Sequence, residues 1–177
     1  MIMKKEFNSN NNKLVNKAFK ILTKFKNNPK KFENIFTELF EKDFEEQLNK
    51  INQLKSGSLK GLIISVKDLF DVKGYHTRGG TKFLKRDICL NDAECISNIR
   101  KAGGLLLGHT NMTELAYSGL GINPHYGTPD NPLYPGSVPG GSTSGGAVSV
   151  ALNLSDIAIG TDTGGSTRIP AAFTGIT

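Results

Sequence analysis

The chain contains no tryptophan and only two cysteines, and it lacks an apolar run long enough to span a membrane. Cys89 and Cys95 do not form a Cys-x-x-Cys pair, so we expect free thiols in a reducing compartment and no cysteine-bound metal. The first residues also lack an apolar core of signal-peptide length. These absences make a cytoplasmic protein without a membrane segment the default expectation.

Histidine, the other common metal ligand, is scarce as well. His76, His109 and His125 show no metal-ligand spacing and no His-Glu-x-x-His word. A Gly-x-Ser-x-Gly turn and a Gly-x-x-x-x-Gly-Lys-Ser/Thr loop are both missing. We therefore expect no metal and no cofactor, so any chemistry must come from other side chains.

Arginine is absent from the first 60 residues, whose 13 lysines and 7 acidic residues account for the whole net charge of +6. Apolar residues recur there at helical spacing between positions 14 and 25 and again between positions 32 and 44, which predicts two amphipathic helices. Interleaved glutamates favour an ordinary solvated face over binding of RNA or a membrane surface. We predict an N-terminal helical segment over residues 1–58 and a second unit over residues 59–177.

In the second unit, apolar runs alternate with helix-like segments. The sequence predicts strands at 62–66, 105–107 and 157–159, and helices at 92–102, after Gly146 and at 168–173. This order indicates an α/β fold with a mixed, largely parallel sheet and flanking helices.

Two glycine-rich loops carry serines that could do chemistry. Ser166 follows Gly164 and Gly165 at a predicted strand-to-helix turn, where glycine allows substrate to approach the main chain closely. Ser142 lies in the second loop, and Lys67 ends a continuous apolar strand, where desolvation favours a neutral amine that can act as a base. Such loops could equally cradle a phosphate, and a lone serine there is more often a turn former.

Taken together, these segments resemble the amidase signature family over roughly residues 60–177. Ser142 and Ser166 are 24 residues apart, which is the family's spacing of relay and nucleophilic serines. The matching motifs occur in the same order as in family members: Ser65-Val-Lys67-Asp68, Gly108–Ala116, Gly127–Pro132 and the two glycine-rich loops.

The resemblance implies a Ser-cisSer-Lys triad that hydrolyses a small-molecule amide to acid and ammonia or amine through an acyl-enzyme. Ser166 would be the nucleophile and Lys67 would be the base. Ser142, which follows a cis peptide bond in family members, would relay the proton between them. Asp162 and Arg168 are expected to brace the loop. The oxyanion hole would use the backbone N–H groups of Thr163, Gly164 and Gly165, together with that of Ser166.

Two branches of the family compete: a free-standing amide hydrolase and the glutamine-hydrolysing A subunit of the aspartyl/glutamyl-tRNA amidotransferase. The sequence of residues 116–126 favours the hydrolase, and so does Ile169, which directly follows Arg168. Nucleic acid is an expected partner only of the amidotransferase, and a homodimer is expected of the full-length protein. Family members continue well beyond position 177, so we expect an amino-terminal fragment that is inactive in amide hydrolysis when alone. A non-catalytic anion- or nucleotide-binding module is the alternative of another class.

Overall fold

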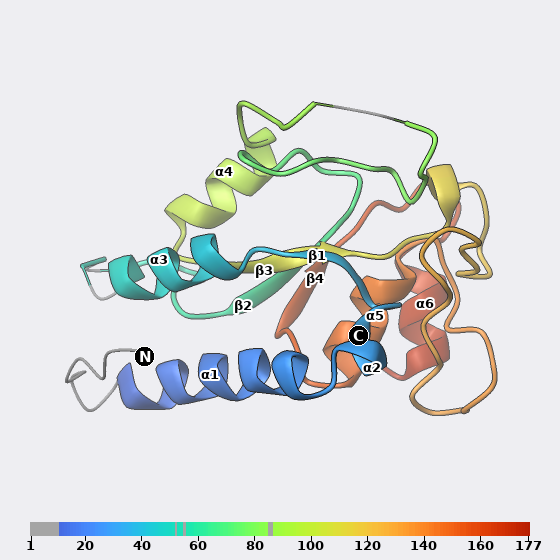
Figure 1. Ribbon diagram of the computed structural model, residues 1–177, viewed down its shortest axis with the longest axis horizontal. Coiled ribbons are helices and arrows are strands. Elements are labelled where there is room, and N and C mark those ends of the chain that lie inside the picture. Colours follow the sequence, from blue (N-terminus) through green and yellow to red (C-terminus); the bar gives the residue numbers. More distant parts are fainter. Residues whose placement is uncertain (1–10, 52, 55, 85–86) are drawn as a thin grey trace.

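The computed structural model describes residues 11–51, 53–54, 56–84 and 87–177, and Figure 1 shows a sheet with helices on both faces. The helical elements are α1 (Asn11–Asn27), α2 (Pro29–Phe32), α3 (Glu41–Ile51), α4 (Glu94–Lys101), the 3-10 turn η1 (Glu114–Ala116), α5 (Ser144–Ala151) and α6 (Arg168–Thr174). The strands are β1 (Phe36–Leu39), β2 (Ile63–Lys67), β3 (Leu105–Thr110) and β4 (Ile157–Ile159).

The four strands form one sheet in the order β1-β3-β2-β4. β2 pairs in parallel with both β3 and β4, whereas β1 pairs antiparallel with β3. The expected mixed, largely parallel sheet with flanking helices is therefore confirmed. The carboxyl ends of the three parallel strands meet at one edge, which is where ligand sites of α/β sheets form.

Successive side chains of the two central strands enter two different hydrophobic clusters. Ile63 and Leu105 face the cluster built with α1, α3 and α5, whereas Ile64 and Leu106 face the cluster built with α4. This follows from the two-residue repeat of a strand, which sends alternate side chains to opposite faces. Because both faces are covered, every residue of β2 and β3 is buried.

The prediction of a second amphipathic helix between positions 32 and 44 is wrong. A helix does end at Phe32, but residues 36–39 form β1, and helical structure resumes only at Glu41. Pairing with β3 explains the difference, since β1 satisfies backbone groups that would otherwise leave that edge of the sheet open. The first 58 residues thus contribute a strand to the same sheet as residues 59–177, while the boundary between the two units remains a prediction.

Helix α5 is fixed to the sheet by close contacts that its sequence makes possible. A Cβ on Gly145 would lie 2.3 Å from the carbonyl oxygen of Ile35, so only glycine allows this approach. Further along the helix, the hydroxyl of Ser149 is hydrogen-bonded to those of Ser65 and Ser155, at 2.9 and 2.8 Å. These contacts set the position of the loop that precedes α5.

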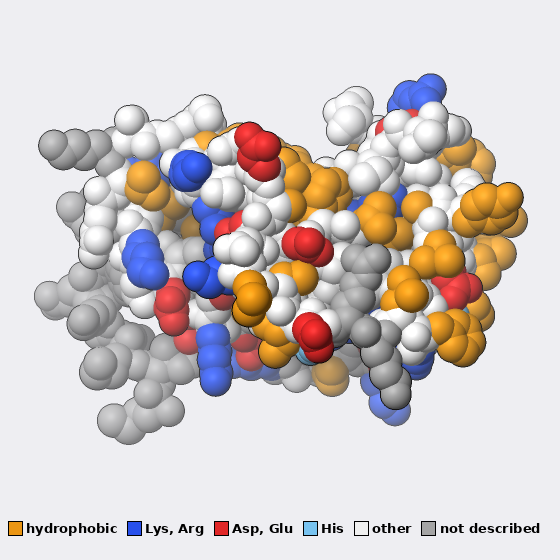
Figure 2. All heavy atoms as spheres, turned by 90° about the horizontal axis from the view of Figure 1, so that it is seen from above, with side chains coloured by type: hydrophobic (Ala, Val, Ile, Leu, Met, Phe, Trp, Pro, Cys, Tyr) orange, Lys and Arg blue, Asp and Glu red, His pale blue; other side chains and the backbone are white. Residues whose placement is uncertain are grey.

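Exposed apolar side chains gather around η1 and the loop that follows it. Leu115, Tyr117, Leu120 and Ile122 are all largely exposed, Tyr117 by 93 %. Figure 2 shows hydrophobic side chains collected at the end of the molecule where η1 and the following loops lie. Within the described residues, no helix combines the length and apolar content needed to cross a membrane.

Candidate active site

Lys67 is the last residue of β2, and its side chain is fully buried. Its Nζ donates to Ser142 Oγ at 2.8 Å and to Thr161 Oγ1 at 2.7 Å. The predicted base and the predicted relay serine are therefore in direct contact, although 75 residues separate them in the sequence.

Burial has a clear effect on this lysine. It lowers the pKa of Lys67 from 10.5 to about 8, and the negative charge of Asp162 partly opposes the shift. Removal from water disfavours the ammonium form, and both direct partners are neutral hydroxyls that do not restore it. At neutral to slightly alkaline pH the group can therefore exchange a proton, as a general base must.

Ser142 is fully buried in the loop before α5, and the Gly141–Ser142 peptide bond is cis, as the resemblance implied. The loop is tied down on both sides, because Thr113 N–H donates to the carbonyl of Ser142 and Gly141 N–H donates to that of Gly119. A Cβ on Gly141 would lie 2.7 Å from Thr113 Oγ1, so the loop has no space for a side chain there.

Ser166 lies in the turn between β4 and α6. It is joined to the Ser142 loop through the backbone, since Thr143 N–H donates to the carbonyl oxygen of Ser166 at 3.1 Å. Among the described residues, no hydrogen bond links the hydroxyls of Ser166 and Ser142. The structure thus brings Lys67 and Ser142 into contact and joins the turn of Ser166 to the residue that follows Ser142. Hydrogen bonds between catalytic groups are often long before substrate binds.

The predicted oxyanion loop is organised by Asp162. Gly165 N–H, one of the predicted donors, instead donates to Asp162 Oδ1 at 2.7 Å. The N–H groups of Thr163, Gly164 and Ser166 make no hydrogen bond within the described part of the chain. Among the described residues, three of the four expected donors therefore have no hydrogen-bond acceptor, and the fourth is bonded to Asp162.

Arg168 completes the same turn. Its guanidinium contacts Asp162 through Nε at 3.1 Å and Nη2 at 2.9 Å, and this pairing is the leading reason that the pKa of the Asp162 carboxyl lies well below its usual range. These two side chains brace the loop, in keeping with the sequence-based expectation. Thr161 was missed, because a threonine in a loop carries no pattern that would mark it as a partner of Lys67.

Asp68, next to the base, faces the other side of the sheet. Its carboxylate accepts Thr37 Oγ1–H and the backbone N–H of Arg78, both at 2.8 Å. Buried His109 lies beside it, with Nδ1 3.6 Å from Asp68 Oδ1, and donates through Nε2 to the carbonyl of Phe70. In the described residues, no three His, Cys, Asp or Glu side chains converge as a metal site.

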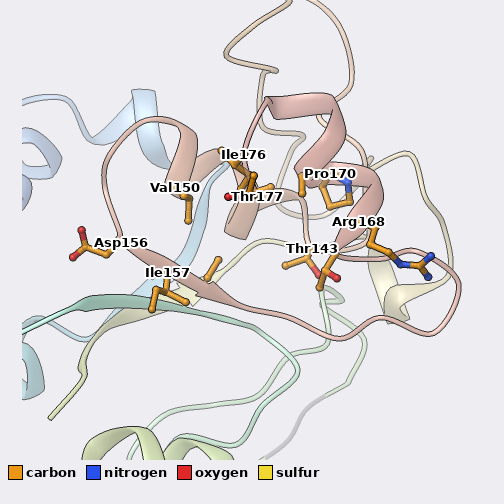
Figure 3. Close-up of a pocket in the computed structure, with 12 residues that line it drawn as sticks. Thr143, Val150, Asp156, Ile157, Arg168, Pro170, Ile176 and Thr177 are labelled. Atoms are coloured by element: carbon orange, nitrogen blue, oxygen red, sulfur yellow. The ribbon is translucent and has the colours of Figure 1, made fainter. Parts of the chain in front are cut away.

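A cavity of about 300 Å³ lies next to the site, between α5, β4 and α6. Figure 3 shows Val150, Ile157 and Pro170 along it, with Asp156 and Arg168 towards opposite ends. Neither the lysine nor the two serines of the predicted triad are among its lining residues. The cavity is therefore separate from the predicted triad.

Several named proteins are similar to this chain. Amidase 1 of Arabidopsis thaliana is 50% identical over 121 residues, which are 67% of this chain and 28% of that protein. Indoleacetamide hydrolase of Pseudomonas syringae pv. syringae is 41% identical, over 77% of this chain and 31% of that protein. The A subunit of glutamyl-tRNA(Gln) amidotransferase from Chromohalobacter salexigens is 46% identical, over 69% of this chain and 25% of that protein. The chain thus spans about a quarter to a third of the length of these relatives.

A solved structure described as a crystal structure of amidase superposes with a TM-score of 0.78 at 37% identity, covering 91% of this chain and 37% of that one. The family model named Amidase matches residues 14–177, nearly the whole chain. This match extends through α1 and β1, well before the segment whose motifs carried the resemblance. The chain therefore belongs to the amidase family.

Proposed function

We propose that this chain supplies the Ser-cisSer-Lys triad of an amide hydrolase. The observation that carries the proposal is the contact between the buried Lys67 amine and the Ser142 hydroxyl at 2.8 Å, beside the turn that holds Ser166. A lysine with a pKa of about 8 is matched to proton transfer near neutral pH.

The reaction begins when neutral Lys67 accepts a proton from Ser142, which in turn takes the proton of Ser166. Ser166 Oγ forms a bond to the amide carbonyl carbon, and the carbonyl oxygen becomes an oxyanion. The open N–H groups of Thr163, Gly164 and Ser166 are the available donors to that oxygen. Such donors are worth about 100- to 1000-fold in rate each.

The tetrahedral intermediate collapses with cleavage of the C–N bond. The proton held by Lys67 returns through Ser142 to the leaving nitrogen, which departs as ammonia or amine. Water then attacks the ester carbonyl of the acyl-enzyme and gives its proton to the same relay. Cleavage of the bond to Ser166 Oγ releases the acid and restores the serine hydroxyl, so each turnover consumes one water.

The free-standing hydrolase is favoured over the amidotransferase branch. Ile169 packs against the site loops, since Cβ atoms built on Gly140 and Gly165 would lie 3.1 and 2.9 Å from its side chain. An apolar side chain at this place suits an amide with an apolar acyl group better than glutamine. The similarity to an amidotransferase keeps glutamine hydrolysis as the second candidate. The free thiols of Cys89 and Cys95 suit the cytoplasm as its location.

Labelling with a fluorophosphonate tests the nucleophile in the 177-residue chain itself. We expect stoichiometric labelling that is lost in Ser166→Ala, and a rate that rises with pH through about 8 as Lys67 loses its proton. Mass spectrometry of the labelled peptide identifies the modified residue. A passive anion-binding loop would give no label, and a label on another serine would refute the assignment.

Turnover is tested with a chimera in which the 121-residue stretch of this chain that is similar to Arabidopsis Amidase 1 replaces the corresponding stretch of that protein. Ammonia release from a panel of primary amides that includes glutamine is measured for the chimera and its Ser166→Ala form. We expect activity that this substitution abolishes, with the preferred amide choosing between the two candidates. A folded chimera that releases no ammonia from any amide, while Amidase 1 does, would contradict the proposal.

A further inference from the structure

Two adjacent residues join the lysine end of the site to the serine end. Thr161 Oγ1 accepts a hydrogen bond from Lys67 Nζ at 2.7 Å. The next residue, Asp162, accepts the backbone N–H groups of Gly165, Thr167 and Arg168. We propose that Thr161 and Asp162 form a positioning unit: Thr161 aims the Lys67 amine at Ser142, and Asp162 holds the turn that presents Ser166. The inference rests on the proposed function and adds two residues to it.

The role of Thr161 follows from the valence of a neutral amine. Neutral Lys67 has one lone pair and two N–H groups, and the lone pair must face the Ser142 hydroxyl to take its proton. An N–H group then needs an acceptor elsewhere, and in the described part of the chain Thr161 Oγ1 is the second partner within hydrogen-bond distance. By accepting that N–H, Thr161 fixes the rotation of the amine. Without it, the amine is free to turn its lone pair away from the relay serine.

The role of Asp162 follows from the number of donors that it collects. Besides three backbone N–H groups, its carboxylate accepts the Thr167 hydroxyl at 2.7 Å and two N–H groups of the Arg168 guanidinium. All these donors flank Ser166 on the chain. A carboxylate bonded in this way orients the turn so that the N–H groups of Thr163, Gly164 and Ser166 remain open.

Because the two residues are neighbours, a shift at one end of the unit is transmitted to the other. The Asp162 charge also acts on Lys67, whose pKa it raises against the effect of burial. The other charged groups near the base have partners on the far side of the sheet, where Asp68 is bonded to Thr37 and to the Arg78 backbone and lies beside His109. Loss of the Asp162 charge should therefore lower the pKa of Lys67.

The test compares Thr161→Val, Thr161→Ser and Asp162→Asn with the unchanged 177-residue chain. Thr110→Val is the matched control, because Thr110 is paired with Lys67 in the sheet and its buried hydroxyl has no hydrogen-bond partner among the residues that the structure describes. The rate of Ser166 labelling by a fluorophosphonate is measured from pH 6 to 10. In parallel, the ¹³Cε resonance of Lys67, assigned with Lys67→Met, gives the pKa of the amine without any requirement for activity.

We expect Thr161→Val to slow labelling by about 10- to 100-fold and Thr161→Ser to restore it. Asp162→Asn should slow labelling and move the Lys67 titration to lower pH, whereas Thr110→Val should change neither. Equal rates for Thr161→Val and the unchanged chain, or no rescue by serine, would overturn the role of Thr161. An unmoved Lys67 titration in Asp162→Asn would overturn the electrostatic link.

The outcomes also separate this inference from the proposed function. If the unchanged chain is not labelled, the proposed nucleophile fails, but the Lys67 titration still decides whether Thr161 and Asp162 act on the amine. If Asp162→Asn loses its circular dichroism signal, Arg168→Gln replaces it, because that side chain is 76 % exposed and contributes two of the donors to the carboxylate. Labelling of Arg168→Gln at the unchanged rate would then overturn the role of Asp162.

Discussion

Replacing Lys67 by methionine should make the chain more stable at neutral pH and less stable at alkaline pH. The pKa of this lysine is about 8 in the folded chain, against 10.5 for the free side chain. At about 1.4 kcal/mol per pKa unit, the protonated lysine costs the folded state about 3 kcal/mol below pH 8. Methionine carries no such cost, and its unbranched side chain fits the same buried space.

Two losses offset part of this gain. Ser142 and Thr161 each lose the hydrogen bond that Lys67 Nζ donates, at about 1 kcal/mol per bond. We therefore expect Lys67→Met to be more stable than the unchanged chain by about 1 kcal/mol at pH 7. The same substitution removes the proposed base, so labelling of Ser166 should fall sharply while stability rises.

The sign of the effect reverses with pH. Between pH 8 and 10.5 the unfolded lysine holds a proton that the folded one has released, so the stability of the unchanged chain rises with pH in this window. By pH 10 it has recovered about 2.5 kcal/mol, which leaves Lys67→Met less stable by about 1.5 kcal/mol. Urea unfolding followed by far-UV circular dichroism at both pH values measures this, since the chain has no tryptophan to report. A stability difference that stays the same at pH 7 and pH 10 would refute the reasoning.

Two further pairs of substitutions test the packing, each by the free energy of unfolding in urea. Gly145→Ala places a Cβ 2.3 Å from the carbonyl oxygen of Ile35 and should cost about 2 kcal/mol or more, whereas Gly164→Ala, with nothing within 4 Å of its Cβ, should change stability by less than about 0.5 kcal/mol. Leu106→Ala removes a fully buried side chain and should cost about 2 to 5 kcal/mol, while Leu90→Ala, at a side chain 80 % exposed, should cost less than about 0.5 kcal/mol. Similar losses within either pair would contradict the contacts described.

The central strands and the motif-bearing loops could be predicted from sequence because their signals are local. Continuous apolar runs define β2 and β3, and the glycine-rich motifs identify the loops of Ser142 and Ser166. β1 could not be found in this way. The apolar residues at Phe36 and Leu39 suit a helix as well as a strand, and pairing with β3 decides between them.

Contacts between side chain and backbone set the other limit on sequence reasoning. Nothing in the order of residues shows that Gly165 N–H is taken by the Asp162 carboxylate and so is withdrawn from the predicted oxyanion hole. The pairing of Thr161 with Lys67 is equally invisible, because 94 residues separate the two and only the adjacent ends of β2 and β4 bring them together. Family motifs indicate which residues meet, but the bonds that orient them appear only in three dimensions.

The wide separation of the contacting groups has a consequence for a chain that is still being synthesised. Lys67 leaves the ribosome long before Ser142 and Thr161, and until β4 and α5 are in place its amine lies in water as an ordinary ammonium group. Packing of these later elements against β2 removes the Lys67 amine from water, which lowers its pKa, and supplies its hydrogen-bond partners. Under the proposed function, a nascent or misassembled chain therefore carries no activated serine, and reactivity at Ser166 would report that α5 and β4 have packed against β2.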